Sequence, residues 1–353
     1  MKIDFFYERE KLPYTSGFIQ KGKNYRCNYI RFKSLYKNAK KGTETVELYN
    51  FQPKSSASAS VMVIPGLGTR NIKFLLWLGA HLASSNVSCN VLILPGNYTR
   101  VEEGSVSGKT YVYPDVNIMY NSWQHAVVDI RTSIDFLEDK NLWEEKNCML
   151  GYCLGGMLSS MVTSLDPRIN ETMFLNTGGY FPKIIHESTV GNFARKMFKK
   201  GYETDYFLHD KNKLYEIYDR DLSIVKNMDL EELINSNEIH PLFKIDPLSY
   251  AHFLDKKKVT FIDAIYDETL PITSRSLLFK ELKGSTRYLL PATHGLLLPF
   301  EFFIAQYIML KLNIKEVKDL KMFIPNKLIP DKLIPKDFKI PLVSDVLQYF
   351  TNE

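Results

Sequence analysis

The chain has 353 residues, of which 45% are hydrophobic and 24% are charged. This composition is typical of a globular protein with enough apolar material for a core, and it excludes a disordered or fibrous chain. The net charge is +5, and the excess is local to the N-terminal region, because residues 1–55 hold 12 Lys or Arg against 5 Asp or Glu.

The first predicted elements are antiparallel strands at a sheet edge. Residues 24–51 alternate aromatic or apolar residues with polar ones around a Lys-rich turn at 38–42. This alternation indicates strands with one buried face. Residues 52–60 contain mainly Ser, Ala, Lys and Pro, which predicts a loop. We therefore expect residues 1–60 to form N-terminal edge strands and a loop.

From residue 61 the chain repeats a strand, a Gly or Pro turn, and an amphipathic helix. Short apolar runs predict strands that are buried on both faces. The predicted strands are 61–64, 91–94, 148–150 and 173–176, and the predicted helices are 72–84, 122–138 and 154–164. This alternation predicts an α/β fold with a mostly parallel central sheet and helices on both faces. Residues 61–180 form the first part of this core.

The strand and helix alternation stops over residues 181–258, which are aromatic, charged and compatible with helices. It resumes with a predicted strand at 259–266, a helix at 273–282 and a strand at 286–290. We therefore expect an inserted helical cap at 181–258 and the second part of the core at 259–313. The tail, 314–353, contains four Ile-Pro pairs, which disfavour a helix and predict an extended strap.

The most informative motif is Gly-x-Cys-x-Gly, centred on Cys153 between a predicted strand and a predicted helix. At such a turn the central residue lies on a strained elbow that exposes it above the sheet, and the flanking glycines allow close backbone approach. The helix that follows directs its first N–H groups toward the thiol. Cys153 is therefore a candidate nucleophile, although a cysteine at this place can also be a small buried hydrophobe.

An acid and a histidine follow in the order that this architecture requires. Asp267 ends the strand at 259–266, and His294 lies in a turn after the strand at 286–290. Both positions belong to the carboxyl edge of the sheet, where ligands bind in open α/β folds. His294 can accept the thiol proton while Asp267 orients the ring. Asp263, inside the strand, and the adjacent Glu268 are the competing acids.

The candidate site also needs hydrogen-bond donors for an oxyanion. We expect one from the backbone N–H of Leu154, directly after the cysteine, and a second from Leu67 or Gly66 in the loop after the first parallel strand. The alternative is an ordinary strand-helix turn. We further expect Tyr152 and the cap residue Phe181 to contact the substrate.

These residues resemble those of the α/β-hydrolase superfamily, over residues 61–298 with the cap interrupting the match. The resemblance is carried by Pro65-Gly66-Leu67-Gly68, Gly151-Tyr152-Cys153-Leu154-Gly155-Gly156, Asp267 with Pro271, and His294-Gly295. Most of the superfamily has serine at the elbow, so Cys153 is a departure. The elbow resembles those of dienelactone hydrolases and polyhydroxyalkanoate synthases, and neither match extends beyond it. The resemblance implies the fold and a Cys-His-Asp acyl-transfer site, and leaves the substrate open.

Three functions follow from this reading. The first is an esterase or thioesterase that forms an acyl-cysteine, and the second is an acyltransferase that passes the acyl group to an acceptor other than water. The third is a binding protein that has the fold without turnover. We expect a small-molecule acyl substrate, no organic cofactor or metal, and no nucleic-acid partner. The oligomeric state is left open.

The cysteines and the first residues predict a cytoplasmic location. Four cysteines in a chain of this length do not form a disulfide framework, so reduced thiols are expected. Acidic residues occupy the positions where a signal peptide needs its apolar stretch, and no apolar run approaches the length of a membrane span.

Overall fold

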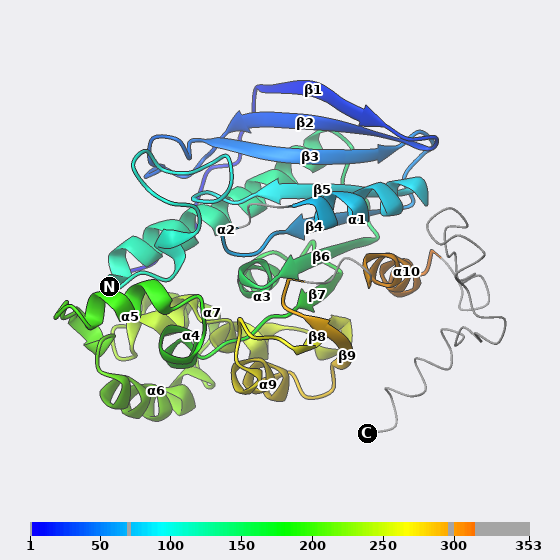
Figure 1. Cartoon of the computed structure of the whole chain (residues 1–353). Helices are drawn as coiled ribbons and strands as arrows, with labels where there is room; N and C mark the ends of the chain where they lie inside the picture. Colours follow the sequence, from blue (N-terminus) through cyan, green and yellow to red (C-terminus); the bar gives the residue numbers. More distant parts are fainter. Residues whose placement is uncertain (1, 69–71, 296–299, 315–353) are drawn as a thin grey trace, which may run out of the picture.

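A computed structural model describes residues 2–68, 72–295 and 300–314 of the chain. The strands in these ranges form one nine-stranded sheet with the order β1-β2-β3-β5-β4-β6-β7-β8-β9 (Figure 1). In chain order they are β1 (Tyr14–Lys21), β2 (Tyr25–Lys33), β3 (Thr45–Pro53), β4 (Ala59–Ile64), β5 (Val87–Ile93), β6 (Asn147–Tyr152), β7 (Glu171–Leu175), β8 (Val259–Tyr266) and β9 (Thr286–Thr293).

The first three strands form an antiparallel section at one edge of the sheet. β2 and β3 pair along their whole length, from Tyr25 opposite Pro53 to Lys33 opposite Thr45, which agrees with the strands predicted over 24–51. The sequence pattern does not predict β1. All eight of its residues are exposed, so the strand has no buried face to leave an alternating pattern in the sequence.

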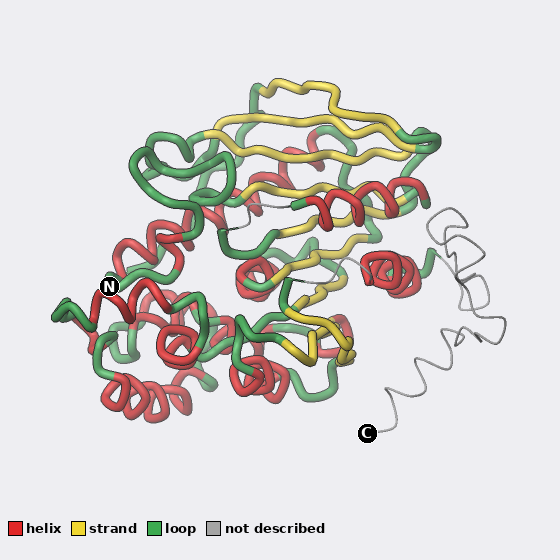
Figure 2. The backbone as a smooth tube through the Cα atoms, in the orientation of Figure 1, coloured by secondary structure: helices red, strands yellow, loops and turns green. Residues whose placement is uncertain are grey.

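Across the rest of the sheet, in the order β5-β4-β6-β7-β8-β9, neighbouring strands pair in parallel. Helices cover both faces of this section (Figure 2). On β4, Val61 and Val63 pack in one hydrophobic cluster with α1 and α10, whereas Met62 and Ile64 pack in another with α2 and α3. The two-sided burial explains why the parallel strands are continuous apolar runs. The helices of this core are α1 (Lys73–Ser84), α2 (Val116–Asp139), α3 (Leu154–Leu165), α9 (Ile272–Glu281) and α10 (Glu301–Lys311).

The predicted core elements are all present, with differences at their ends. The largest difference is α2, which begins at Val116 rather than near Ser122. Asp115 precedes this helix, and its carboxylate accepts the backbone N–H groups of Asn117 and Ile118. This side-chain cap stabilises an earlier start than the apolar periodicity predicts.

Residues 181–258 form short helices between β7 and β8, as the sequence predicts. They are α4 (Phe181–Glu187), α5 (Asn192–Phe198), η2 (Asp205–Phe207), α6 (Lys211–Val225), α7 (Leu230–Asn235), η3 (Pro241–Ile245), α8 (Pro247–Tyr250), η4 (Ala251–Phe253) and η5 (Lys256–Lys258), and a further turn, η1 (Lys109–Tyr111), precedes α2. The buried carboxylate of Asp246 accepts the N–H groups of Tyr180 and Phe181 and the hydroxyl of Tyr218. It therefore ties the start of this segment to α6. The strap predicted for 314–353 lies outside the described residues, apart from Ile314.

Candidate active site

Cys153 lies at a sharp turn between β6 and α3. Its backbone has φ 53° and ψ −113°, a left-handed conformation that is rare for a residue with a side chain. Its N–H donates to the carbonyl of Leu175 at 2.8 Å, so the end of β7 supports the turn. A strained conformation of this kind costs about 1–3 kcal/mol and persists where the surroundings fix it, often at functional sites.

The glycines of the motif are required by close backbone contacts. A Cβ atom on Gly155 would lie 2.0 Å from the carbonyl oxygen of Ile64, at the end of β4. A Cβ atom on Gly156 would lie 1.8 Å from the hydroxyl of Thr177, after β7. Any side chain at either position would push α3 away from the sheet. The glycines thus place the first turn of α3 directly against the strand ends around Cys153.

His294 and Asp267 meet at the same edge of the sheet. The imidazole Nδ1 of His294 lies 2.8 Å from Asp267 Oδ2, and the carboxylate has no exposed surface. Its other oxygen accepts the N–H groups of Thr269 and Leu270. Burial raises the pKa of Asp267, but the bonds from His294 and Leu270 and the charge of Arg275 lower it more, so that the pKa lies below its ordinary value.

The His294 ring also lies close enough to the side chain of Cys153 for the two groups to interact electrostatically. Burial lowers the pKa of His294, but the electrostatic interaction with Cys153 and the interaction with Asp267 raise it to about 10. Because Nδ1 faces Asp267, Nε2 is the nitrogen available to the sulfur. The structure therefore brings together the three side chains that the sequence singles out.

Cys153 is less exposed than the elbow motif predicts. Its exposed fraction is 4%, against 1% for Cys27 and 0% for Cys89 and Cys148. The loop after β4 covers it, since a Cβ atom on Gly66 would lie 3.4 Å from the Cβ of Cys153. All four cysteines are free thiols, and burial raises the pKa of the other three.

The expected oxyanion donors flank Cys153. Leu154 is the first residue of α3, and the first N–H groups of a helix have no acceptor within it. The loop with Gly66 and Leu67 lies beside the elbow and is held by Asn97, whose side chain accepts the N–H of Gly68 and donates to the carbonyl of Gly66. This loop is therefore fixed next to the thiol.

The two expected substrate contacts have other partners. The hydroxyl of Tyr152 donates to the backbone carbonyl of His294 at 2.7 Å, and the two rings lie 5.2 Å apart between centroids. Phe181 has no exposed surface and packs edge-to-face against Trp123. Phe181 thus belongs to the hydrophobic core, and its contact with a substrate stays a prediction.

One residue of the site has no sequence motif. Asn176 follows β7 with φ 49°, and its side-chain amide donates to the same His294 carbonyl at 3.3 Å. Its side-chain oxygen accepts the N–H of Ala264 on β8 at 2.6 Å. An Asn at the carboxyl end of a predicted parallel strand is the only signal that sequence offered for it.

The competing acids are excluded by geometry. Asp263 is fully buried on β8, where its carboxylate pairs with Arg287 at 2.8 Å and with Arg275 at 3.4 Å. Glu268 is exposed, and Nδ1 of His294 bonds Asp267 instead. Asp267 is the acid that faces the histidine.

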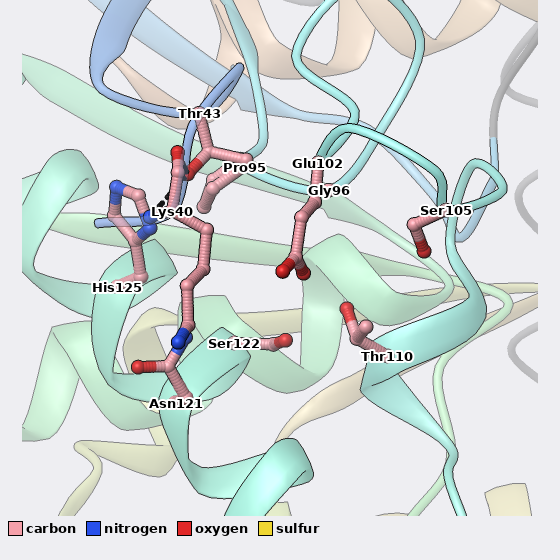
Figure 3. Close-up of a pocket in the computed structure, with 10 residues that line it drawn as sticks. All are labelled: Lys40, Thr43, Pro95, Gly96, Glu102, Ser105, Thr110, Asn121, Ser122 and His125. Carbon is pink, nitrogen blue, oxygen red and sulfur yellow. Dashed lines mark hydrogen bonds between the residues drawn. The ribbon is translucent and has the colours of Figure 1, made fainter. Parts of the chain in front are cut away.

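A second polar cluster lies elsewhere in the described part of the chain. Ser34, His125, Asp129 and Arg100 are buried together, and His125 also lines a cavity of about 20 Å³ (Figure 3). This cavity has room for about one water molecule. Among the described residues, no group of three or more His, Cys, Asp or Glu side chains is placed to hold a metal ion, and no helix is both long and apolar enough to span a bilayer.

No family model and no curated protein matches the chain. Solved structures are similar to it at low sequence identity. An acetyl xylan esterase from Paenibacillus sp. R4 is 15% identical with a TM-score of 0.51, over 85% of this chain and 89% of that chain. Acetyl xylan esterase 1 from Thermoanaerobacterium sp. is 12% identical with a TM-score of 0.52, over 86% and 89%.

An acylaminoacyl peptidase from Pyrococcus horikoshii is 14% identical with a TM-score of 0.53, over 83% of this chain and 42% of that chain. At these identities the similarity concerns the fold. The mostly parallel sheet, the helices on both of its faces and the similarity to these structures together show that the chain has an α/β-hydrolase fold.

Proposed function

We propose that the protein is an acyl hydrolase, of the carboxylesterase or thioesterase type, that acts through an acyl-cysteine on Cys153. The observation that carries this proposal is the position of His294, whose Nδ1 bonds Asp267 and whose ring interacts electrostatically with the nearby side chain of Cys153. This is the arrangement of a nucleophile, a base and an orienting acid. The solved structures named above as esterases and a peptidase support a hydrolase.

Proton transfer from the Cys153 thiol to Nε2 of His294 generates the nucleophile, and the raised pKa of His294 keeps this proton on the ring. The sulfur forms a bond with the acyl carbon, and the carbonyl oxygen becomes an oxyanion. When the intermediate collapses, the bond to the leaving alcohol or thiol breaks and His294 returns the proton to it. Water then attacks the acyl-cysteine, with His294 accepting its proton, and the carboxylic acid and the free thiol are released.

Asp267 and the oxyanion donors have separate roles in this scheme. Asp267 accepts a hydrogen bond from Nδ1–H of His294, which fixes the ring and stabilises the imidazolium that forms. The N–H of Leu154, with that of Leu67 or Gly66, would stabilise the oxyanion, and one such donor is worth about 3–4 kcal/mol in measured cases.

Acyl transfer is the second candidate, and the low exposure of Cys153 favours it. A thiol that is 4% exposed lies in a site with little bulk water, and limited water prolongs a reactive acyl intermediate. An amine or thiol acceptor that enters the site would then compete with hydrolysis. We propose that the helical segment 181–258 acts as the cap that controls this access.

The test is intact-mass detection of an acyl adduct. The protein is mixed with p-nitrophenyl esters and acyl thioesters of different acyl length, with and without an amine acceptor, and quenched in acid. If the protein is a hydrolase, we expect a transient acyl adduct on Cys153 and release of the free carboxylic acid. If it is an acyltransferase, we expect the acylated amine as product. Cys153→Ala is the control and should form no adduct. Turnover by this variant, or no adduct with any substrate, would contradict the proposal.

A further inference from the structure

The structure assigns Asn176 and Tyr152 a shared role as positioning residues that hold the backbone carbonyl of His294 and thereby aim its ring at Cys153. This inference rests on the proposed function and identifies residues that control the same site without touching the substrate. It follows from one atom, the His294 carbonyl oxygen, which accepts two side-chain hydrogen bonds from two different strand ends.

The first of these bonds comes from Asn176. Its amide nitrogen donates to the His294 carbonyl at 3.3 Å, and its amide oxygen accepts the N–H of Ala264 at 2.6 Å. The orientation of the amide is fixed by chemistry, because a carbonyl can only accept and an N–H can only donate. Asn176 is fully buried, so water does not compete for these bonds. It links the His294 loop to β8, three residues before Asp267.

The second bond comes from Tyr152. Its hydroxyl donates to the His294 carbonyl at 2.7 Å, and its ring packs against both the His294 ring and Phe74. Tyr152 is the last residue of β6 and directly precedes Cys153. This bond therefore fixes the histidine backbone relative to the nucleophile.

The two bonds together fix the backbone of His294 relative to Cys153 and Asp267. His294 follows β9, the last strand of the sheet, and the bond between Nδ1 and Asp267 fixes only one side of its ring. A ring on a turn can rotate or shift about that single bond. The carbonyl is held from the end of β6, which bears Cys153, and by Asn176 after β7, which is itself bonded to Ala264 of β8. These bonds limit this freedom, and small displacements of a general base cost large factors in rate.

The experiment uses variants that keep shape and remove a donor. Tyr152→Phe loses only the hydroxyl. Asn176→Asp tolerates the left-handed backbone and keeps the acceptor for Ala264, but loses the donor to His294. The matched controls are Tyr250→Phe, which removes a hydroxyl bond to the carbonyl of Lys244, and Asn147→Asp. The latter keeps the acceptor for the N–H of Asn170 and loses the amide bonds to backbone carbonyls near the start of β6.

The measurement is the rate of Cys153 alkylation by iodoacetamide against pH, located by peptide mass spectrometry, together with thermal unfolding. Alkylation needs no substrate, so it tests the positioning even if no ester is hydrolysed. We expect Tyr152→Phe and Asn176→Asp each to lower the alkylation rate at neutral pH by about five- to tenfold, the size of one lost hydrogen bond. The rate should recover at high pH, where the thiol ionises without help from His294.

Where a substrate has been found, kcat should fall by a similar factor with little change in KM. The inference is overturned if both variants have the wild-type pH profile of alkylation. It is also overturned if the two control variants shift that profile equally, since the effect would then come from general loosening of the fold. Failure of the proposed function would give a different result. Wild type would show no turnover, while Tyr152→Phe and Asn176→Asp would still change the pH profile of Cys153 alkylation.

Discussion

Two buried clusters of this protein contain a nucleophilic side chain, a histidine and an aspartate, and they differ in how the histidine is used. At the sheet edge, His294 bonds Asp267 through Nδ1 and interacts with Cys153. In the second cluster, Nε2 of His125 lies 3.1 Å from the hydroxyl of Ser34 and 3.2 Å from Asp129. One ring nitrogen there faces both partners.

The hydrogen bonds of the second cluster do not allow His125 to take the proton of Ser34. Ser34 donates its hydroxyl directly to Asp129 at 2.5 Å, and Arg100 pairs with the same carboxylate at 2.6 Å. The serine proton is thus committed to the acid, and the acid is neutralised by a guanidinium. The same residue types therefore give a structural tie in one place and a candidate active site in the other, and geometry makes the difference.

The largest expected effect is the difference in activity between variants of Cys153 and of Ser34. Cys153→Ala should lower kcat/KM for ester or thioester hydrolysis by about 10⁴-fold or more, because the variant lacks the group that forms the covalent bond. Ser34→Ala should leave kcat near that of wild type and destabilise the fold by about 1–3 kcal/mol, since Asp129 loses a buried bond. Steady-state kinetics and urea unfolding of both variants test the comparison, which fails if the serine variant is the inactive one.

The two aspartates of the β8 region should separate in the same way. Asp267→Asn should reduce kcat by about 10²–10⁴-fold with little loss of stability, because His294 loses its orienting acceptor. Asp263→Asn should cost about 3 kcal/mol of stability with smaller effects on turnover, because Arg275 and Arg287 lose a buried partner. Kinetics and chemical unfolding distinguish them, and a reversed pattern would make Asp263 the acid of the site.

The coupling between Cys153 and His294 predicts a pKa change that is measurable by NMR. The charge of Cys153 is the largest factor that raises the pKa of His294 to about 10. In Cys153→Ser the hydroxyl stays neutral, so the pKa of His294 should fall well below that of wild type. The C2 proton of His294, assigned with His294→Gln, reports the titration. An unchanged pKa would show that the thiol and the ring are not coupled.

The smallest expected effect concerns acid stability of the second cluster. Burial raises the pKa of Asp129, but His125 and Arg100 lower it more, to about 2. An aspartate in the unfolded chain titrates near 3.9, so the ionised group contributes about 2 kcal/mol above that pH. This contribution is lost as the pH falls from about 4 toward 2. Urea unfolding of Asp129→Asn should show a flatter dependence over this interval than wild type.

The sequence alone predicted the core of the fold and the identity of the three meeting side chains. Buried parallel strands must be apolar on both faces, so the strand at 61–64 can be predicted from its apolar run without tertiary information. The glycines around Cys153 also predict the elbow, since its strained backbone and close contacts limit which residues fit there. The order of Cys153, Asp267 and His294 along the chain follows from the order of the strands that carry them.

Tertiary structure alone decided the contacts between loops. Asn176 and Tyr152 meet at the carbonyl of His294, and a hydrogen bond to a backbone atom requires no particular residue type at the accepting position, so it leaves no motif. The low exposure of Cys153 and the burial of Phe181 likewise depend on segments that are distant in sequence. Local patterns determine which elements form, whereas the surroundings of each side chain depend on how those elements pack.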